Sequence, residues 1–228
     1  LRNMEYLVYK KNAEYGASHY KLIADILLND NTANYTTWNT TAPANAWTPM
    51  GSDTTVSFKG VFDGGNFSIS GIYSNAKFSG LFGAIGAEAV VKNLTIKESF
   101  VKTTSAGGMV GMLAGYNKGR IHNVHNEGNV SANMTTAGSY VLGGGLIGFN
   151  NEGVVDSCSN AGSIDILGNS KGNRVSTGGV IGKDFRGNLN ALSNSGAVSV
   201  RSQSNNSVVG KAFTGGIVGY SAYTLITN

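Results

Sequence analysis

The 228-residue sequence is short of several features that usually decide a protein's class. A single cysteine, Cys158, excludes an internal disulfide framework. Charged residues make up 13% of the chain, against roughly 25% in average soluble proteins. The formal charge of +4 is scattered, without a run of about five or more like charges, so we expect no nucleic-acid or lipid-headgroup patch. No apolar run approaches the roughly 18 residues of a membrane span, so we expect no direct membrane insertion.

Glycine is plentiful instead, and its positions repeat. The chain has 33 glycines and only 2 prolines. Two glycines, two apolar residues and a further glycine recur at 144–148, 178–182 and 215–219. An Asn-x-Gly-x-Val/Ile motif begins at Asn126, Asn160 and Asn194, a step of 34 residues each time. A fixed period of this size indicates stacked supersecondary units rather than a single packed globule.

The 34-residue step assigns residues to columns that run along the stack. Three columns stay apolar: Ile121/Val155/Leu189, Val124/Cys158/Leu192 and Val130/Ile164/Val198. Their neighbours vary among Asn, Ser, Asp and His, so the apolar columns form the interior. Parallel strands of successive coils pair at roughly 4.8 Å, and parallel crossovers are right-handed. We therefore predict an all-β fold, a right-handed parallel β-helix of about five coils.

Two sets of residues have structural positions in this repeat. Asn126, Asn160 and Asn194 are expected to stack at one corner, where asparagine tolerates a left-handed backbone and its amides can hydrogen-bond along the stack. The repeated glycines are Gly83, Gly115, Gly148, Gly182 and Gly219. The unit around residues 108–117 is longer than the others, which leaves Gly111 as an alternative to Gly115; the residues that follow fit Gly115 better.

The N-terminal region differs from the repeats. Apolar residues from Leu1 to about Ala13 recur at helical spacing, with Gly16 just beyond, so we predict one amphipathic helix that caps the open end of the coils. This gives a capping helix at 1–19 and a β-helix domain at 20–228. Tyr20–Leu28 is the expected first strand, and Asn29–Ala46 is an expected polar loop. We expect the chain to be a piece of a longer protein.

The motifs together resemble the GLUG-motif repeats. The resemblance rests on WTPMG at 47–51, FKGVFDG at 58–64, ISGI at 69–72, GLFG at 80–83 and the later Gly-Gly-x-Val/Ile-Gly units. Similar repeats occur in large secreted or surface-anchored bacterial proteins, including adhesin-like proteins and the non-catalytic N-terminal regions of M26 immunoglobulin A peptidases. One departure is the turn at 63–66, which reads Asp-Gly-Gly-Asn where the family more often has Asp-Gly-Asn-Gly. The resemblance implies a fold and a location on the cell surface or outside the cell, but no ligand and no catalytic residue.

The residues after the repeated glycines form the candidate binding strip. Tyr116, Phe149 and Tyr220 each follow such a glycine, and Lys183 occupies the same column. Facing outward and flanked by Asn117 and Asn150, they could stack on sugar rings and hydrogen-bond hydroxyls. The alternative is that these rings fill the corner of the coil.

Catalytic and metal chemistry has weaker support. His122 and His125 lie three apart, which in an extended strand points them to opposite faces, and the sequence has no HExxH motif or Cys/His cluster, so we expect no metal site and no other cofactor. Cys158 lies in an apolar column and is expected to be a buried structural residue. Glycoside hydrolysis needs two carboxylates roughly 5–9.5 Å apart, and the acidic residues here do not repeat in register.

These observations predict a non-catalytic, adhesin-like module of a bacterial surface or secreted protein, whose partner is a host or environmental glycan or a protein receptor. Two alternatives remain: a polysaccharide-active β-helix enzyme, and a passive spacer in a larger surface protease. The simplest expectation for the oligomeric state is a monomer.

Overall fold

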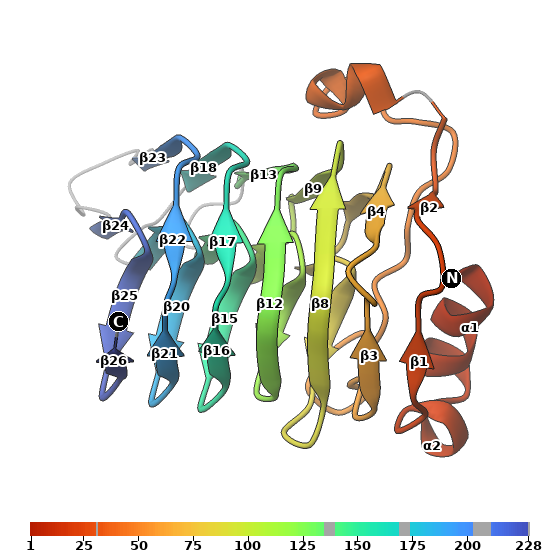
Figure 1. The fold of residues 1–228 in the computed structure, drawn as a ribbon. Helices are drawn as coiled ribbons and strands as arrows, with labels where there is room; N and C mark the ends of the chain where they lie inside the picture. Colours follow the sequence, from red (N-terminus) through yellow and green to blue (C-terminus); the bar gives the residue numbers. More distant parts are fainter. Residues whose placement is uncertain (31, 135–139, 169–173, 203–210, 228) are drawn as a thin grey trace.

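The computed structural model describes residues 1–30, 32–134, 140–168, 174–202 and 211–227, and it shows a parallel β-solenoid with an N-terminal helix (Figure 1). Every pairing between its described strands is parallel. The solenoid has about four turns, slightly fewer than the predicted five. Three of its sheets have five strands each, so about four turns separate the first strand of such a sheet from the last.

Four sheets form the walls. The 11-stranded long sheet contains β1 (Tyr20–Lys21), β2 (Ile26–Leu27), β3 (Val61–Asp63), β4 (Ser68–Ser70), β8 (Val90–Lys97), β12 (Arg120–Asn126), β16 (Val154–Asp156), β17 (Ser159–Asn160), β21 (Asn188–Asn190), β22 (Ser193–Asn194) and β26 (Leu225–Thr227). The five-stranded β5 sheet contains β5 (Tyr73–Asn75), β9 (Phe100–Thr103), β13 (Asn129–Asn133), β18 (Ile164–Gly168) and β23 (Val198–Ser202).

The other two sheets also have five strands each. The β6 sheet contains β6 (Phe78–Ser79), β10 (Gly108–Gly111), β14 (Val141–Gly144), β19 (Arg174–Gly178) and β24 (Lys211–Gly215). The β7 sheet contains β7 (Phe82–Ile85), β11 (Ala114–Asn117), β15 (Ile147–Asn151), β20 (Ile181–Phe185) and β25 (Val218–Ala222). Each coil passes through the long, β5, β6 and β7 sheets and then returns to the long sheet.

The strand register agrees with the columns predicted from the 34-residue step. Ile121 pairs with Val155 and Val155 with Leu189, and all three side chains are buried. Leu192 and Val198, at the last positions of their columns, are only partly buried, because few side chains follow them along the axis. Tyr116 pairs with Phe149, which makes Gly115 the equivalent of Gly148, while Gly111 pairs with Gly144.

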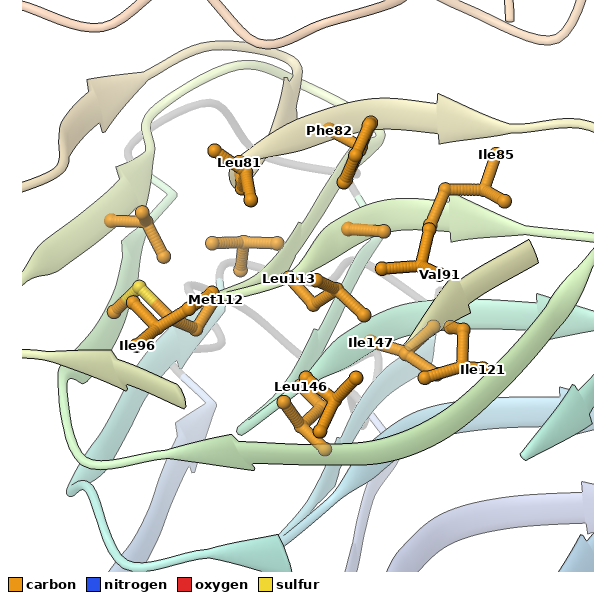
Figure 2. Packing of buried hydrophobic residues seen from close by; sticks show 14 of the residues in the cluster. Leu81, Phe82, Ile85, Val91, Ile96, Met112, Leu113, Ile121, Leu146 and Ile147 are labelled. Atoms are coloured by element: carbon orange, nitrogen blue, oxygen red, sulfur yellow. The ribbon is translucent and has the colours of Figure 1, made fainter. Parts of the chain in front are cut away.

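The core changes character along the axis. Aromatic side chains fill its N-terminal part, where the Phe58 and Phe82 ring centroids lie 5.1 Å apart and those of Phe62 and Phe82 lie 5.7 Å apart. Further along, aliphatic side chains from successive coils stack, among them Leu113, Leu146 and Ile147 (Figure 2). One continuous cluster of buried residues joins these parts, so the repeats are held together by side chains that contact the coil before and the coil after.

The helix at the N-terminal end contributes to the same core, beside β1 (Figure 1). α1 (Arg2–Lys10) buries Met4 and Val8. The predicted single helix is divided, because Lys11 leaves helical geometry and α2 (Asn12–Tyr15) follows. The Asn12 side-chain amide donates to the Val8 carbonyl at 2.9 Å and to the Ser57 carbonyl at 3.0 Å, and so competes with the helical backbone for the Val8 acceptor.

Two other N-terminal expectations differ in detail from the structure. The expected strand at Tyr20–Leu28 is two short strands, β1 and β2, which pair with β3 and β4 on either side of the turn at 63–66. The turn itself spans residues 64–67: Gly65 and Asn66 both have positive φ, and the Phe67 N–H donates to the Gly64 carbonyl, as in a type I′ turn.

The expected polar loop at Asn29–Ala46 contains a 3₁₀ helix, η1 (Thr32–Thr37), followed by the buried Trp38. The Trp38 ring packs edge-on against Tyr73 at a centroid distance of 6.2 Å, within a small cluster that also includes Phe100. The loop therefore covers part of the β5 sheet with an apolar side chain that its composition does not reveal.

The repeated glycines are required by a close approach between the β6 and β7 sheets. A Cβ added at Gly148 would lie 2.6 Å from the backbone N of Val110, and one at Gly182 would lie 2.6 Å from the backbone O of Gly143. Gly115 and Gly219 face backbone atoms of the β6 sheet in the same way, and Gly83 faces the backbone of Gly51. A rigid backbone cannot give way as a flexible side chain could, so any larger residue would separate the two sheets.

Candidate functional site

Three asparagines form a ladder along the long sheet, with Asn126 and Asn160 buried and Asn194 partly buried. The Asn126 Nδ2 donates to Asn160 Oδ1 at 2.7 Å, and the Asn160 Nδ2 donates to Asn194 Oδ1 at 2.7 Å. Each side chain also bonds the backbone of the glycine two residues later. The Asn126 Nδ2 donates to the Gly128 carbonyl and the Asn126 Oδ1 accepts from the Gly128 N–H, both at 2.8 Å. Asn194 bonds the carbonyl and the N–H of Gly196 in the same way, and the Asn160 Nδ2 donates to the Gly162 carbonyl. This inner ladder, Asn126/Asn160/Asn194, has the stacking that the sequence spacing predicts.

A second ladder changes the interpretation of the candidate binding strip. Asn117 and Asn150, predicted to flank the rings on the outer surface, are fully buried. The Asn117 Nδ2 donates to Asn150 Oδ1 at 2.7 Å, and the Asn150 Nδ2 donates to Asp184 Oδ1 at 2.6 Å. Because these amides are enclosed and already bonded to one another, they cannot bind a ligand, and we remove them from the candidate site.

Asp184 ends this second ladder as an acceptor. Its carboxylate also accepts from the Gly187 N–H at 3.1 Å and from the Thr224 hydroxyl. The amides of the ladder donate in one direction along the axis, and a carboxylate is acceptor-only, so aspartate fits the last position. The sequence held a signal for this ladder, because Asn117-Lys118-Gly119 repeats the Asn-x-Gly spacing of the inner ladder.

The remaining strip residues do share one outer column of the β7 sheet. The register pairs Tyr116 with Phe149, Phe149 with Lys183, and Lys183 with Tyr220, and all four side chains are partly buried. The Tyr116 and Phe149 rings meet edge to face at 5.7 Å, and the Lys183 Nζ lies 4.7 Å from the Phe149 ring centroid. We call these four residues, Tyr116, Phe149, Lys183 and Tyr220, the aromatic column. Part of each side chain is accessible to solvent.

A neighbouring group of residues adds cations and rings. Asn151 pairs with Phe185, and the Arg186 guanidinium lies 4.9 Å from the Phe185 ring. Tyr223 meets Phe185 edge to face at 5.9 Å and is 82% exposed. The aromatic column and its neighbours make one surface, the aromatic face, which consists of Tyr116, Lys118, Phe149, Asn151, Lys183, Phe185, Arg186, Tyr220 and Tyr223.

One carboxylate links two cations on this face. Glu152 lies 3.0 Å from the Lys118 Nζ and 3.9 Å from an Arg186 guanidinium nitrogen. Hydrogen bonding and charge from Glu152 raise the pKa of Lys118, so this lysine stays protonated. All three side chains are substantially exposed, so the ion pairs contribute little to stability but do orient the cations on the surface.

A pocket adjoins the aromatic column at Tyr116. It has a volume of about 550 Å³, and its lining includes Thr54, Lys59, Glu88, Tyr116 and Lys118. A ring, two ammonium groups, a carboxylate and a hydroxyl converge there. The sequence did not reveal this pocket, because Lys59 and Glu88 come from coils in which the 34-residue step has not yet begun.

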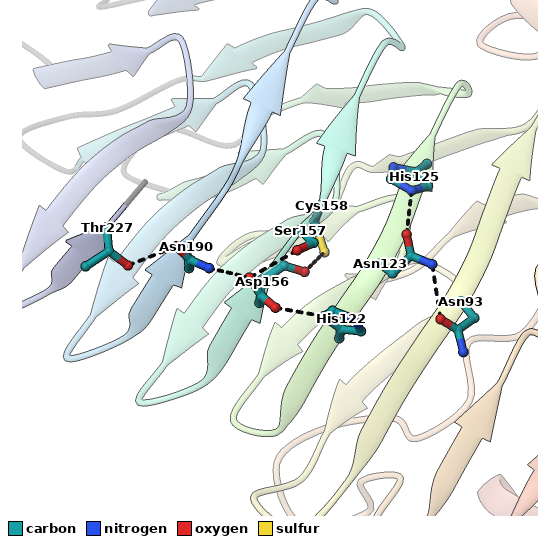
Figure 3. Close-up of polar contacts among 9 residues, drawn as sticks. All are labelled: Asn93, His122, Asn123, His125, Asp156, Ser157, Cys158, Asn190 and Thr227. Atoms are coloured by element: carbon teal, nitrogen blue, oxygen red, sulfur yellow. Dashed lines mark hydrogen bonds and ion pairs between the residues drawn. The ribbon is translucent and has the colours of Figure 1, made fainter.

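The outer surface of the long sheet carries a row of polar side chains in place of the rings of the aromatic face. Its outer row, Asp63/Lys92/His122/Asp156/Asn190/Thr227, follows the strand register across the sheet. His122 Nδ1 lies 2.8 Å from Asp156 Oδ2, and the Asn190 Nδ2 donates to Asp156 Oδ1 at 2.6 Å (Figure 3). These bonds hold the pKa of Asp156 below its ordinary value, with the Asn190 bond the larger cause.

The prediction that the two histidines point to opposite faces is wrong. Asn123 has φ of +53°, which bends β12 between them and breaks the alternation, so Ile121 and Val124 both point inward and both histidines lie on the outer side (Figure 3). His125 contacts Ser159 Oγ at 2.8 Å and Asn123 Oδ1 at 3.0 Å, separately from the His122–Asp156 pair. Within the described ranges, no three His, Cys, Asp or Glu side chains gather in a way that could hold a metal ion.

Cys158 is buried in the inner column, 1% exposed, and its Sγ donates to the Asp156 carbonyl at 3.1 Å. Burial raises the pKa of this thiol to about 12, which opposes formation of the nucleophilic thiolate. Three acidic side chains that glycoside chemistry could use occupy separate surroundings: Asp165 pairs with Arg201 at 2.8 Å, Glu152 pairs with Lys118 at 3.0 Å, and Asp184 is buried. In the part of the chain that the structure describes, no helix is long and apolar enough to cross a membrane.

Comparison with known proteins found two curated relatives. A protein named "Putative Gly-rich membrane protein" from Evansella cellulosilytica is 36% identical over 84 residues, which are 36% of this chain and 10% of that protein. "Halomucin" from Haloquadratum walsbyi is 32% identical over 140 residues, which are 60% of this chain and 1% of that protein. The matches therefore cover only small parts of much longer relatives. No family model matches the sequence.

A solved structure has a similar overall course of the chain. It is that of "a putative immunoglobulin A1 protease from Bacteroides ovatus", with a TM-score of 0.48 and 16% sequence identity, and the match covers 92% of this chain and 77% of that chain.

Proposed function

We propose that this chain is a non-catalytic repeat module of a bacterial surface protein and that its aromatic face binds glycans. The surface location is supported by the relatives, which are named as a membrane protein and as halomucin. The binding role rests on one observation, the aromatic column, in which partly accessible rings and Lys183 are held in fixed relation by the strand register. Rings of this kind stack on the apolar faces of sugars, and the nearby cations and amides can bond sugar hydroxyls.

The aromatic face suits a glycan better than the outer row does. Phe149 and Tyr116 present partly accessible rings, whereas the polar groups at the centre of the outer row are already bonded to one another. Binding to polar groups that have partners must first break those bonds, which removes most of the gain. A sugar that stacks on the rings of the aromatic face breaks no hydrogen bond, because its contacts with a ring are made in addition to the contacts between the rings.

The test is a glycan array probed with the purified chain and with a double variant, Tyr116→Ala with Phe149→Ala. Loss of most of the array signal in the double variant supports the proposal, with circular dichroism to verify that both proteins are folded. Tyr6→Ala is the matched control, because Tyr6 is 57% exposed on α1, away from this face, and its loss should leave binding unchanged. Equal binding by the folded double variant and the wild type would contradict a role for the aromatic column.

A passive stalk is the second candidate, favoured by the burial of Asn117 and Asn150 and by the partial burial of the rings. Absence of binding to any glycan on the array would support it. The polysaccharide-active enzyme is tested in parallel, by incubating bound glycans with the chain and assaying new reducing ends or unsaturated products. Cleavage would replace the binding proposal with an enzymatic one.

A further inference from the structure

The pocket lies beside Tyr116, where the aromatic column continues toward the N-terminus in small residues. Tyr116 pairs with Ala84 in the preceding coil. The bridge between Phe58 and Ile85 extends the column by one more coil, to Ser57. Beyond the Tyr116 ring, the next two positions therefore hold two small, buried residues, Ala84 and Ser57, and Ser57 lines the pocket together with Tyr116.

The adjacent column places a glycine between two lysines. Because Asn117 pairs with Ile85 and Phe58 bridges Ile85, the next residues, Lys59, Gly86 and Lys118, follow one another in successive coils. Parallel strands are about 4.8 Å apart, so the two lysine backbones are roughly 10 Å apart. Gly86 adds no side chain to the gap, and both lysines line the pocket.

The two lysines differ in how their charges are balanced. Lys118 is paired with Glu152 at 3.0 Å. Lys59 is exposed, and within the described residues its ammonium has no ion pair or hydrogen bond. Counting the pocket and the aromatic face together, four cations stand against two exposed carboxylates: Lys59, Lys118, Lys183 and Arg186 against Glu88 and Glu152. This surface therefore favours an anionic ligand.

The Tyr116 hydroxyl offers a directed contact in the same place. It accepts a hydrogen bond from the Asn151 Nδ2 at 2.7 Å, which leaves its own proton to donate to a ligand. Thr54, which carries a second hydroxyl, also lines the pocket. A ring wall, a hydroxyl donor and an ammonium without a partner match a sugar ring that carries a negative group.

We propose, building on the proposed glycan-binding function, that this pocket binds an acidic saccharide, with the sugar ring against Tyr116 and its carboxylate or sulfate group at Lys59 and Lys118. The pocket selects the charged unit, and the aromatic column beyond Tyr116 binds the sugars that follow it. Neutral glycans would then bind through the column alone, and more weakly.

The test is a biosensor titration of the purified chain with two pairs of ligands. Oligogalacturonate is compared with its fully methyl-esterified form, and sulfated dextran oligosaccharide with unsulfated dextran, so that each pair differs in charge on the same kind of chain. An exposed ion pair contributes at most about fivefold in affinity, so two lysines should favour an acidic ligand by roughly five- to tenfold. The pair that shows the larger preference identifies carboxylate or sulfate as the preferred group.

Three variants separate the pocket from general charge. Lys59→Gln should remove about fivefold of the affinity for the acidic ligand and leave binding of the neutral ligand unchanged. Lys21→Gln removes the same charge from β1 of the long sheet, where the side chain is exposed, and should change neither. Gly86→Ala keeps every charge but adds a Cβ 2.9 Å from Ser57 Oγ and 3.2 Å from Lys59 Cγ, so it should also weaken binding of the acidic ligand.

The outcomes distinguish this inference from the proposed function. Equal affinity for the charged and neutral ligands would overturn the pocket assignment and leave glycan binding intact. Equal losses in Lys59→Gln and Lys21→Gln would also overturn it, because net charge would then explain the preference. Binding of single-stranded DNA as tightly as oligogalacturonate, with the same Lys59 dependence, would assign the pocket to polyanions in general and overturn the saccharide assignment. Binding of none of the ligands would overturn both proposals.

Discussion

The inner ladder and the outer row belong to the same sheet and use the same repeat, yet they differ in composition. The inner ladder holds asparagine in three successive coils, at Asn126, Asn160 and Asn194. The outer row, four residues earlier in the chain, holds histidine, aspartate and asparagine at His122, Asp156 and Asn190. Both are linked by hydrogen bonds from coil to coil, so bonding along the stack does not explain why one position is uniform and the other is varied.

The difference follows from access to water. Asn126 and Asn160 are each 1% exposed, so each amide must find its donors and acceptors inside the protein, and the backbone of the following Gly supplies them in one geometry. His122 and Asp156 have side chains that are 53% and 30% exposed. Water can replace a lost partner there, so the position tolerates different residues. Uniform polar columns in this solenoid therefore indicate burial.

The strongest test of this comparison is Asn160→Ala. The change removes the Asn160 donor from the Gly162 carbonyl and from Asn194 Oδ1, and it removes one of the three acceptors of the Asn126 Nδ2, which keeps the Gly128 and Gly145 carbonyls. A buried group without a partner costs about 1–3 kcal/mol, so we expect a loss of roughly 2–4 kcal/mol in the free energy of unfolding. Chemical denaturation monitored by circular dichroism measures it.

The matched control is Asn190→Ala, which removes an asparagine from the outer row of the neighbouring coil. Its side chain bonds Asp156 and Thr227 near the surface, so the cost should be below about 1 kcal/mol. Similar losses for the two variants would show that burial does not separate the ladder from the row.

A second, smaller effect distinguishes the outer row from the inner ladder: the contribution of the outer row to stability depends on pH. Hydrogen bonds from Asn190 and His122 lower the pKa of Asp156 in the folded state. A carboxyl group with a lowered folded pKa stabilises the protein above its unfolded value of about 3.9, and that contribution is lost as the pH falls through the folded pKa. Asp156→Asn should therefore cost less than about 1 kcal/mol near neutral pH, because the group is partly exposed, and nothing below the folded pKa.

The measurement compares the free energy of unfolding of the wild type and Asp156→Asn from neutral to acidic pH. The difference should shrink with falling pH. The cost of Asn160→Ala should stay constant over the same range, since amides do not titrate. A wild-type advantage over Asp156→Asn that grew in acid would contradict the assigned direction of the pKa shift.

The repeat period explains why much of this fold could be predicted from the sequence. The 34-residue step identified which residues stack, because parallel coils without insertions keep one register; Ile121, Val155 and Leu189 are an example. The step identifies neighbours along the axis but not the face to which a residue points. That depends on local bends such as the left-handed Asn123, which turned both histidines outward.

The candidate site was predicted less completely for the same reason. Tyr116 and Phe149 share an outer column as expected, but Asn117 and Asn150, one residue later, point inward and form the second ladder. The alternation of side chains in a strand would have placed them on the inner side. The pocket at Lys59 was not predictable, because its residues come from N-terminal coils whose register is visible only in the pairing of Phe58 with Ile85.

The smallest expected effect concerns Cys158, whose neighbours in sequence belong to the outer surface. Its thiol is buried and its pKa is raised to about 12, so the folded protein should not react with iodoacetamide near pH 8, while the denatured protein should react fully. Ser193→Cys in a Cys158→Ala background is the control, because Ser193 is exposed on β22, next in register after Ser159. That thiol should react without denaturation. Equal reactivity of the two thiols in the folded protein would mean that the column of Cys158 opens to solvent. The distinction between interior and surface columns would then fail at Cys158 and Ser159, which are adjacent in the sequence.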